Sequence, residues 1–170
     1  MKKKILLGLV AVFVIIQFFR PAKNISGEST HDISTKYPVP EEVASLLKVA
    51  CNDCHSNTTV YPWYSNIQPL GWWLSSHIND GKRHLNFSEF TSRRIAFQNH
   101  KLEETVEMIK EGEMPLESYT MMGLHPGSKL SEDQRQTLIT WAEGIMDTLK
   151  AHYPPDSLKM PRRTPPPAEK

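Results

Sequence analysis

Cysteine is almost absent from this sequence: the chain of 170 residues contains only Cys51 and Cys54. A structural zinc ion takes four ligands, commonly from two cysteine or histidine pairs, and no second cysteine pair exists here. An excess of charge is lacking too, because 20 Lys and Arg residues stand against 19 Asp and Glu residues. The sequence therefore has no basic footprint for nucleic acid, and we expect no nucleic-acid partner.

Strand-like alternation of apolar and polar residues is also missing, and there is no internal repeat. A thioredoxin-like C-x-x-C pair lies at the end of a strand in a βαβ unit, which this pattern does not offer. A disulfide between Cys51 and Cys54 is within reach in an oxidising compartment, but it lacks that enzymatic context. Helical periodicity remains, so we expect an all-α domain.

Long hydrophobic runs are limited to residues 5–19, which follow three lysines, Lys2 to Lys4. A charged start before an apolar stretch is typical of export, and the positive-inside rule places the lysines in the cytoplasm. As a helix, this run covers roughly 22 Å of a hydrocarbon core about 30 Å thick. A cleaved signal peptide is an alternative, but no clean small-x-small site follows. We favour an uncleaved anchor in the inner membrane, with the rest of the chain on the periplasmic side.

Composition divides the chain into four parts. Residues 1–20 are the signal or anchor segment, 21–36 a linker, 37–150 the folded domain and 151–170 a tail. The linker is polar and aperiodic, which predicts a tether. The tail is rich in proline, which predicts an extended and disordered end.

Four segments of the domain carry helical signals. Residues 39–56 begin with a proline and two glutamates, and residues 68–81 begin near a proline and end at Gly81. Residues 86–112 read as one broken helix or two, stopped by Gly112, and the segment from residue 129 has a capping box. The capping box consists of Ser131 and Gln134. The first and last segments each have a predicted buried face, formed by Val43, Leu46, Leu47 and Ala50 in the first and by Leu138, Trp141, Ala142, Ile145 and Leu149 in the last.

The stretch from Cys51 to His55 reads C-x-x-C-H, which is the signature of c-type haem attachment. At the end of a helix, cysteines three residues apart point the same way and can form thioethers with the two vinyl groups of haem. The histidine that follows presents its imidazole to the iron as the proximal ligand. Since covalent attachment takes place outside the cytoplasm, it agrees with the export signal. We therefore predict one covalently attached haem c.

A six-coordinate iron needs a second axial ligand. Small single-haem cytochromes c place a methionine, often before a proline, in a loop ahead of the C-terminal helix, and Met114-Pro115 resembles that arrangement. Met114 is the predicted distal ligand, and His77 is the alternative. The plainer interpretation of His77 is a histidine bonded to a haem propionate or a backbone carbonyl. His125 is interpreted as a turn residue.

Other side chains have predicted structural roles. The aromatic cluster after the motif is expected to form core or a wall of the haem pocket, since haem is a large apolar plate. It consists of Tyr61, Trp63, Tyr64, Trp72 and Trp73. The histidines predicted to lie on the surface are His31, His84, His100 and His152.

The order of these motifs resembles the bacterial haem-binding domain family related to c-type cytochromes. The resemblance covers roughly residues 37–146 and includes "CNDCHSNTTVYPWY", "IQPLGWWLSSHINDGKRHLNFSEF", "EGEMPLESY" and "LHPGSKLSEDQRQTLITWA". It implies one covalent haem c, an exported location and a cytochrome-like helical fold. It carries over Cys51 and Cys54 as attachment sites and His55 as proximal ligand, and leaves the distal ligand open.

The expected function is electron transfer through a single haem, with redox partner proteins that the sequence does not name and with no enzymatic activity. A haem-based sensor or binding module for a small gas is the alternative, and a peroxidase-like enzyme is a further one. The enzyme would need both Met114 and His77 to stay off the iron. A di-haem peroxidase is excluded because there is no second haem motif.

Overall fold

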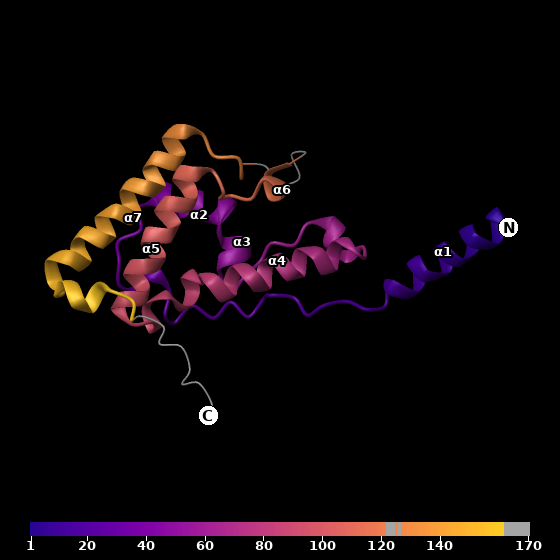
Figure 1. Cartoon of the computed structure of the whole chain (residues 1–170), viewed down its shortest axis with the longest axis horizontal. Helices are drawn as coiled ribbons and strands as arrows, with labels where there is room; N and C mark the ends of the chain where they lie inside the picture. Colours follow the sequence, from indigo (N-terminus) through magenta and orange to yellow (C-terminus); the bar gives the residue numbers. More distant parts are fainter. Residues whose placement is uncertain (122–124, 126, 162–170) are drawn as a thin grey trace, which may run out of the picture.

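The computed structural model describes residues 1–121, 125 and 127–161, and the regular structure in these ranges is helical (Figure 1). They contain no β-strand, and their single strand-like contact is an isolated antiparallel bridge between Ile25 and Thr58. The all-α prediction is confirmed.

The α-helices are α1 (Lys2–Ile16), α2 (Glu41–Ala50), α3 (Asn52–His55), α4 (Leu70–His84), α5 (Ile95–Glu111), α6 (Glu117–Thr120) and α7 (Glu132–His152). Short 3-10 helices connect them: η1 (Ile33–Thr35), η2 (Trp63–Asn66), η3 (Phe87–Ser92) and η5 (Pro155–Leu158). The predicted broken helix over residues 86–112 is thus two helices, η3 and α5.

The main core lies where α2, α5 and α7 pack together (Figure 1). All nine residues predicted on the buried faces of α2 and α7 are buried in it. The indole N–H of Trp141 donates to the carbonyl of Pro38 at 3.0 Å, which fixes the chain entering α2 against α7. A smaller cluster of Tyr64, Leu74 and Ile78 joins η2 to α4.

Most of the predicted helix ends follow local sequence, including the starts of α2 and α4 at Pro40 and Pro69. Ser131 and Gln134 form the predicted capping box at the start of α7. Gly112 ends α5 as predicted, and it does so in the left-handed conformation, with φ of 76°. The predicted stop at Gly81 is wrong, because α4 continues to His84 and ends at Leu85, whose backbone is extended.

The predicted tether, residues 21–36, is bound to the domain rather than free. The Asn24 side chain donates to the Ser56 carbonyl and to Thr59 Oγ1, both at 2.9 Å, and accepts from Lys82 Nζ at 2.6 Å. Further along, Ile33 is buried in the main core. Polar composition suggested a solvated linker, but these polar groups form hydrogen bonds with the loop after the cysteine motif.

The predicted start of the disordered tail, residue 151, is wrong, because the folded part of the chain continues beyond it. Ala151 and His152 belong to α7, η5 follows, and Tyr153 and Leu158 pack against the main core. Apolar side chains between the prolines give this part its contacts. The rest of that predicted tail, residues 162–170, lies outside the described residues.

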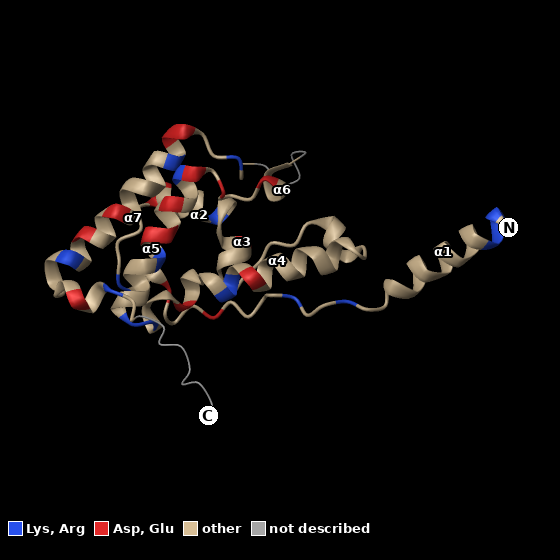
Figure 2. Cartoon of the chain, in the orientation of Figure 1, with Lys and Arg blue, Asp and Glu red and all other residues tan. Residues whose placement is uncertain are grey.

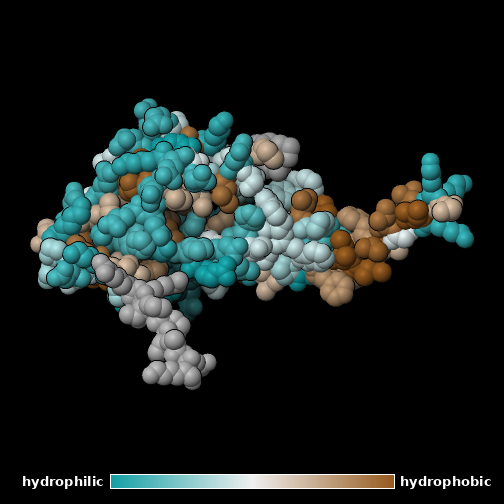
Figure 3. Space-filling view, viewed as in Figure 1, coloured by the Kyte–Doolittle hydropathy of each residue, from teal (hydrophilic) through white to brown (hydrophobic). Residues whose placement is uncertain are grey.

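At the other end, α1 extends from the domain, and its apolar side chains are exposed (Figures 1 and 3). Among the described helices, none is both long enough and apolar enough to cross a membrane, so the structure does not support the anchor predicted over residues 5–19.

Candidate functional site

The two cysteines lie where α2 gives way to a single further turn of helix. Cys51 ends α2 and is also the N-cap of α3, and its carbonyl accepts from the amides of Cys54 at 3.1 Å and His55 at 2.9 Å. This tight turn brings Cys51, Cys54 and His55 to the wall of one cavity.

That cavity has a volume of about 480 Å³ and lies between α3, the second half of α4, α5 and the segment from Met114 to α6. Its volume falls in the range of small-molecule and cofactor sites. Much of the wall is apolar, including Ala50, Leu85, Phe87, Met108, Ile109, Pro115 and Leu116.

Gly81 allows α4 to approach the cysteine motif closely. A Cβ atom at Gly81 would lie 2.6 Å from the Cys54 carbonyl oxygen and 3.0 Å from Cys54 Cβ. These distances leave no space for a side chain, so the residue that we interpreted as a helix stop is a packing position. The close contact places the C-terminal half of α4 along the cavity.

His55 has its imidazole oriented by the backbone. Its Nδ1 lies 3.0 Å from the carbonyl oxygen of Leu85, and its ring meets Phe87 edge-on with centroids 6.4 Å apart. Burial lowers the pKa of His55, so the imidazole is neutral at pH 7. Because a carbonyl can only accept, Nδ1 carries the proton and Nε2 keeps the lone pair that a metal ligand needs.

Both cysteines are free thiols. Burial raises the pKa of Cys51 to about 12, helped by the charge of Cys54, and burial beside Asp53 raises the pKa of Cys54 to about 11. Catalytic thiols of disulfide oxidoreductases have lowered pKa values, so these two lack that activation.

Both candidate distal ligands line the same cavity. Met114 follows the end of α5, where its amide donates to the Met108 carbonyl at 3.2 Å and its own carbonyl accepts from Arg135 Nη1 at 3.4 Å. His77, on α4, has Nδ1 2.9 Å from the Trp73 carbonyl, and its ring lies against that indole with centroids 4.4 Å apart. The structure thus brings all five predicted site residues together.

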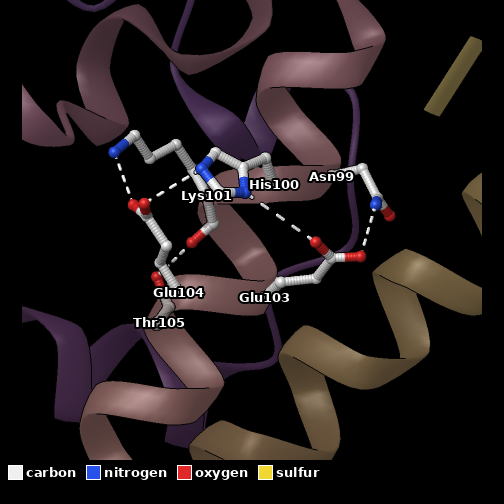
Figure 4. A network of polar contacts seen from close by, with 6 residues as sticks. All are labelled: Asn99, His100, Lys101, Glu103, Glu104 and Thr105. Atoms are coloured by element: carbon white, nitrogen blue, oxygen red, sulfur yellow. Dashed lines mark hydrogen bonds and ion pairs between the residues drawn. The ribbon is translucent and has the colours of Figure 1, made fainter. Parts of the chain in front are cut away.

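Sequence reasoning missed further residues of the wall, among them Lys101, Met108 and His84. For α5 the sequence does contain a pattern that could have indicated a shared face. The positions i, i+3, i+4 and i+7 of one helix face are occupied by Lys101, Glu104, Thr105 and Met108. Figure 4 shows the polar part of this face, where Lys101 and His100 both pair with Glu104. His84 was interpreted as a surface residue; it is exposed but lies at the cavity edge.

The aromatic wall predicted after the motif is wrong. None of the five residues of that cluster lines the cavity, and Tyr64 alone among them is buried. The reason is that these residues lie just before η2, on η2 and on the first half of α4, whereas the cavity borders the second half of α4.

A hydrogen-bonded group of side chains extends from the cavity wall beside the motif. Tyr119, on α6, donates to Asp53 Oδ2 at 2.7 Å, and its ring stacks on His125 with centroids 3.8 Å apart. His125 Nε2 in turn lies 2.6 Å from the Tyr64 hydroxyl oxygen. His125 is therefore more than a turn residue, since it joins α6 to η2.

The wall of this cavity is largely apolar, and the donors on it that suit iron are the neutral imidazole of His55, through Nε2, and the thioethers of Met108 and Met114. The thiols of Cys51 and Cys54 belong to the same wall. A scan against protein-family models matches residues 11–144 to the haem-binding domain. The chain belongs to this family of haem-binding domains. Comparison with curated proteins found no match, and comparison with solved structures found none either.

The match places the whole cavity inside the haem-binding domain, since every wall residue from Ala50 to Tyr119 falls within residues 11–144. The predicted family is thereby confirmed, and haem is the cofactor of this domain.

Proposed function

We propose that this haem-binding domain is a mono-haem electron carrier in which Cys51 and Cys54 hold haem c through thioethers and His55 is the proximal ligand. The observation that carries the proposal is the His55 imidazole, whose Nδ1 is occupied by the Leu85 carbonyl while the ring lies beside both thiols in one cavity. When bound, haem iron supplies one-electron redox chemistry.

The distal ligand we propose is Met114. Two contacts support it: Arg135 holds its carbonyl and the Met108 carbonyl holds its amide, so the backbone that carries the thioether is fixed at the cavity wall. His77 is the alternative, with its imidazole engaged by Trp73 of its own helix. Met108 is a second thioether on the same wall and has to be tested beside Met114.

Lys101 is the residue we propose as partner of a haem propionate. Its side chain is only 11% exposed, it lines the cavity, and its charge is balanced by Glu104 (Figure 4). A buried lysine that already has a carboxylate partner can share its three N–H donors with a second carboxylate.

We further propose that the protein is exported and that residues 5–19 associate with the inner membrane, with redox partner proteins in the periplasm. Lysines precede an apolar helix whose side chains are exposed, as an export or membrane-associated segment requires. Thioether attachment of haem outside the cytoplasm agrees with this location.

Optical and low-temperature EPR spectra of the exported, haem-loaded protein test the proposal. We expect low-spin iron with a sulfur-to-iron charge-transfer band that Met114→Ala abolishes and that His77→Ala and Met108→Ala leave in place. Met160→Ala is the control, because Met160 is a half-exposed methionine outside the cavity. Denaturing gels stained for haem check the covalent bond, which Cys51→Ala with Cys54→Ala should remove.

Other outcomes point elsewhere. High-spin iron in the unmutated protein would refute the carrier and favour a peroxidase-like enzyme, which needs an open iron position, or a small-gas sensor. Loss of the band in Met108→Ala alone would transfer the distal role to α5. A colourless protein from cells that attach haem to other C-x-x-C-H proteins would remove the proposal altogether.

A further inference from the structure

The end of the domain that faces α1 has no charged residue of its own. No Asp, Glu, Lys or Arg occurs from residue 55 to residue 79, which is the stretch that forms η2 and most of α4. Figure 2 shows this end of α4 without red or blue, in contrast to α5 and α7. Because η2 and this part of α4 carry no charge, they favour an apolar partner.

Large apolar side chains are exposed on the same end. Trp63 is 72% exposed and Leu70 is 47% exposed, and Ile67, Trp72 and Trp73 are exposed as well. We call these five residues the tryptophan surface. A water-soluble surface rarely groups so many indoles, whereas a membrane–water interface collects them because an indole is apolar with one polar N–H.

Specific bonds hold the tryptophan surface against the apolar N-terminal segment. Gln17 is the polar residue in that segment; its side chain accepts from the Gln68 amide at 2.9 Å and donates to the Gln68 carbonyl at 3.2 Å. The Trp72 indole N–H donates to the Phe19 carbonyl at 2.6 Å. Figure 3 accordingly shows brown side chains continuing from α1 onto this end of the domain.

We propose that the tryptophan surface is a lipid-binding surface that lies in the bilayer interface beside residues 5–19. Its occupant is a phospholipid bilayer because the surface is uncharged, rich in indole and continuous with an exposed apolar helix. Arg20 and Lys23, next along the chain, add the positive charge that anionic headgroups attract. The inference rests on the proposed membrane association of residues 5–19, and adds the folded domain as a second contact.

The proposal also places the cavity relative to the membrane interface. From Leu70 at the tryptophan surface to Gly81 at the cavity, α4 rises about 16 Å at 1.5 Å per residue. The haem pocket therefore sits within about one helix length of the interface, on the far half of α4.

Hydrogen exchange of the full haem-loaded chain, with and without mixed vesicles of phosphatidylcholine and phosphatidylglycerol, tests the proposal. We expect vesicles to slow exchange in residues 60–73 as well as in α1, and to leave α7 unchanged. In vesicle co-sedimentation, the double variant Trp63→Ser with Leu70→Ser should bind about tenfold more weakly or worse. Met160→Ser, which alters an exposed apolar side chain outside this surface, should bind within about twofold of the unmutated chain.

Two results would overturn the proposal, and they differ. Protection of α1 with unchanged exchange in residues 60–73 would mean that the domain does not touch lipid, although the segment does. An unmutated chain that stays in the supernatant would refute membrane association itself. The haem spectrum of each sample, recorded before vesicles are added, shows separately whether the carrier proposal stands and whether the double variant is folded.

Discussion

Replacing Gly81 by alanine tests whether close contact between α4 and the cysteine motif shapes the cavity. The new Cβ would lie 2.6 Å from the Cys54 carbonyl oxygen, whereas ordinary contact begins at 3.4 Å. The obstacle is backbone, which cannot rotate away, so α4 and α3 must separate by about 0.8 Å. Overpacking of this kind costs about 1–3 kcal/mol.

Alanine also has a better helix propensity than glycine, by about 1 kcal/mol, and this gain must be separated from the clash. Gly144 in α7 is the matched control, because a Cβ there meets nothing within 4 Å. We expect Gly144→Ala to raise the free energy of unfolding by about 0.5–1 kcal/mol. The free energy of unfolding of Gly81→Ala should then be about 1–3 kcal/mol lower than that of the control variant.

Urea unfolding followed by far-UV circular dichroism measures both variants, and the haem absorbance of exported protein measures attachment. Equal midpoints for the two variants would refute the reasoning about close contact. Gly81→Ala should also lower the yield of attached haem, since the separation displaces Cys54, whereas Gly144→Ala should leave the yield unchanged.

Three further predictions concern single side chains. Asn24→Ala removes three hydrogen bonds and should lower the free energy of unfolding by about 1–3 kcal/mol. Hydrogen exchange in residues 56–59 should become faster, and unchanged exchange would contradict the bound linker. Tyr119→Phe loses the bond to Asp53, and should cost on the order of 1 kcal/mol and speed exchange in residues 114–121 but not in α7. Tyr37 is buried against Gln98, and burial raises its pKa to about 12. The unfolded phenol ionises near pH 10, so stability should fall between about pH 10 and 12. Tyr37→Phe should make that fall shallower in urea titrations, and an unchanged slope would show that other groups cause it.

Sequence alone predicted the features that depend on neighbouring residues. The capping box of α7, the helix stop at Gly112 and the buried face of α2 are local patterns, and each is confirmed. The residues Cys51, Cys54 and His55 carry a motif, so their grouping could also be read directly.

Features that depend on distant contacts could not be predicted. In the sequence Gly81 resembles a helix stop, and only the structure shows that the Cys54 backbone packs against it. Asn24 resembles a linker residue because its partners lie more than thirty residues away. Lys101 and Met108 repeat at helical spacing, but only the packing of α5 shows which of its faces meets the cavity.

The bonds of Asn24 have a consequence for the order of maturation. Its amide, like its side chain, is occupied, because it donates to the Tyr61 hydroxyl at 2.7 Å, and Gly27 donates to the Asn57 carbonyl at 3.2 Å. A processing protease needs an extended, unbonded substrate. Any cut near residues 20–28 therefore has to precede the folding of the loop after the motif. Once that loop has closed on Asn24, residues 1–19 stay joined to the turn that carries Cys51 and Cys54.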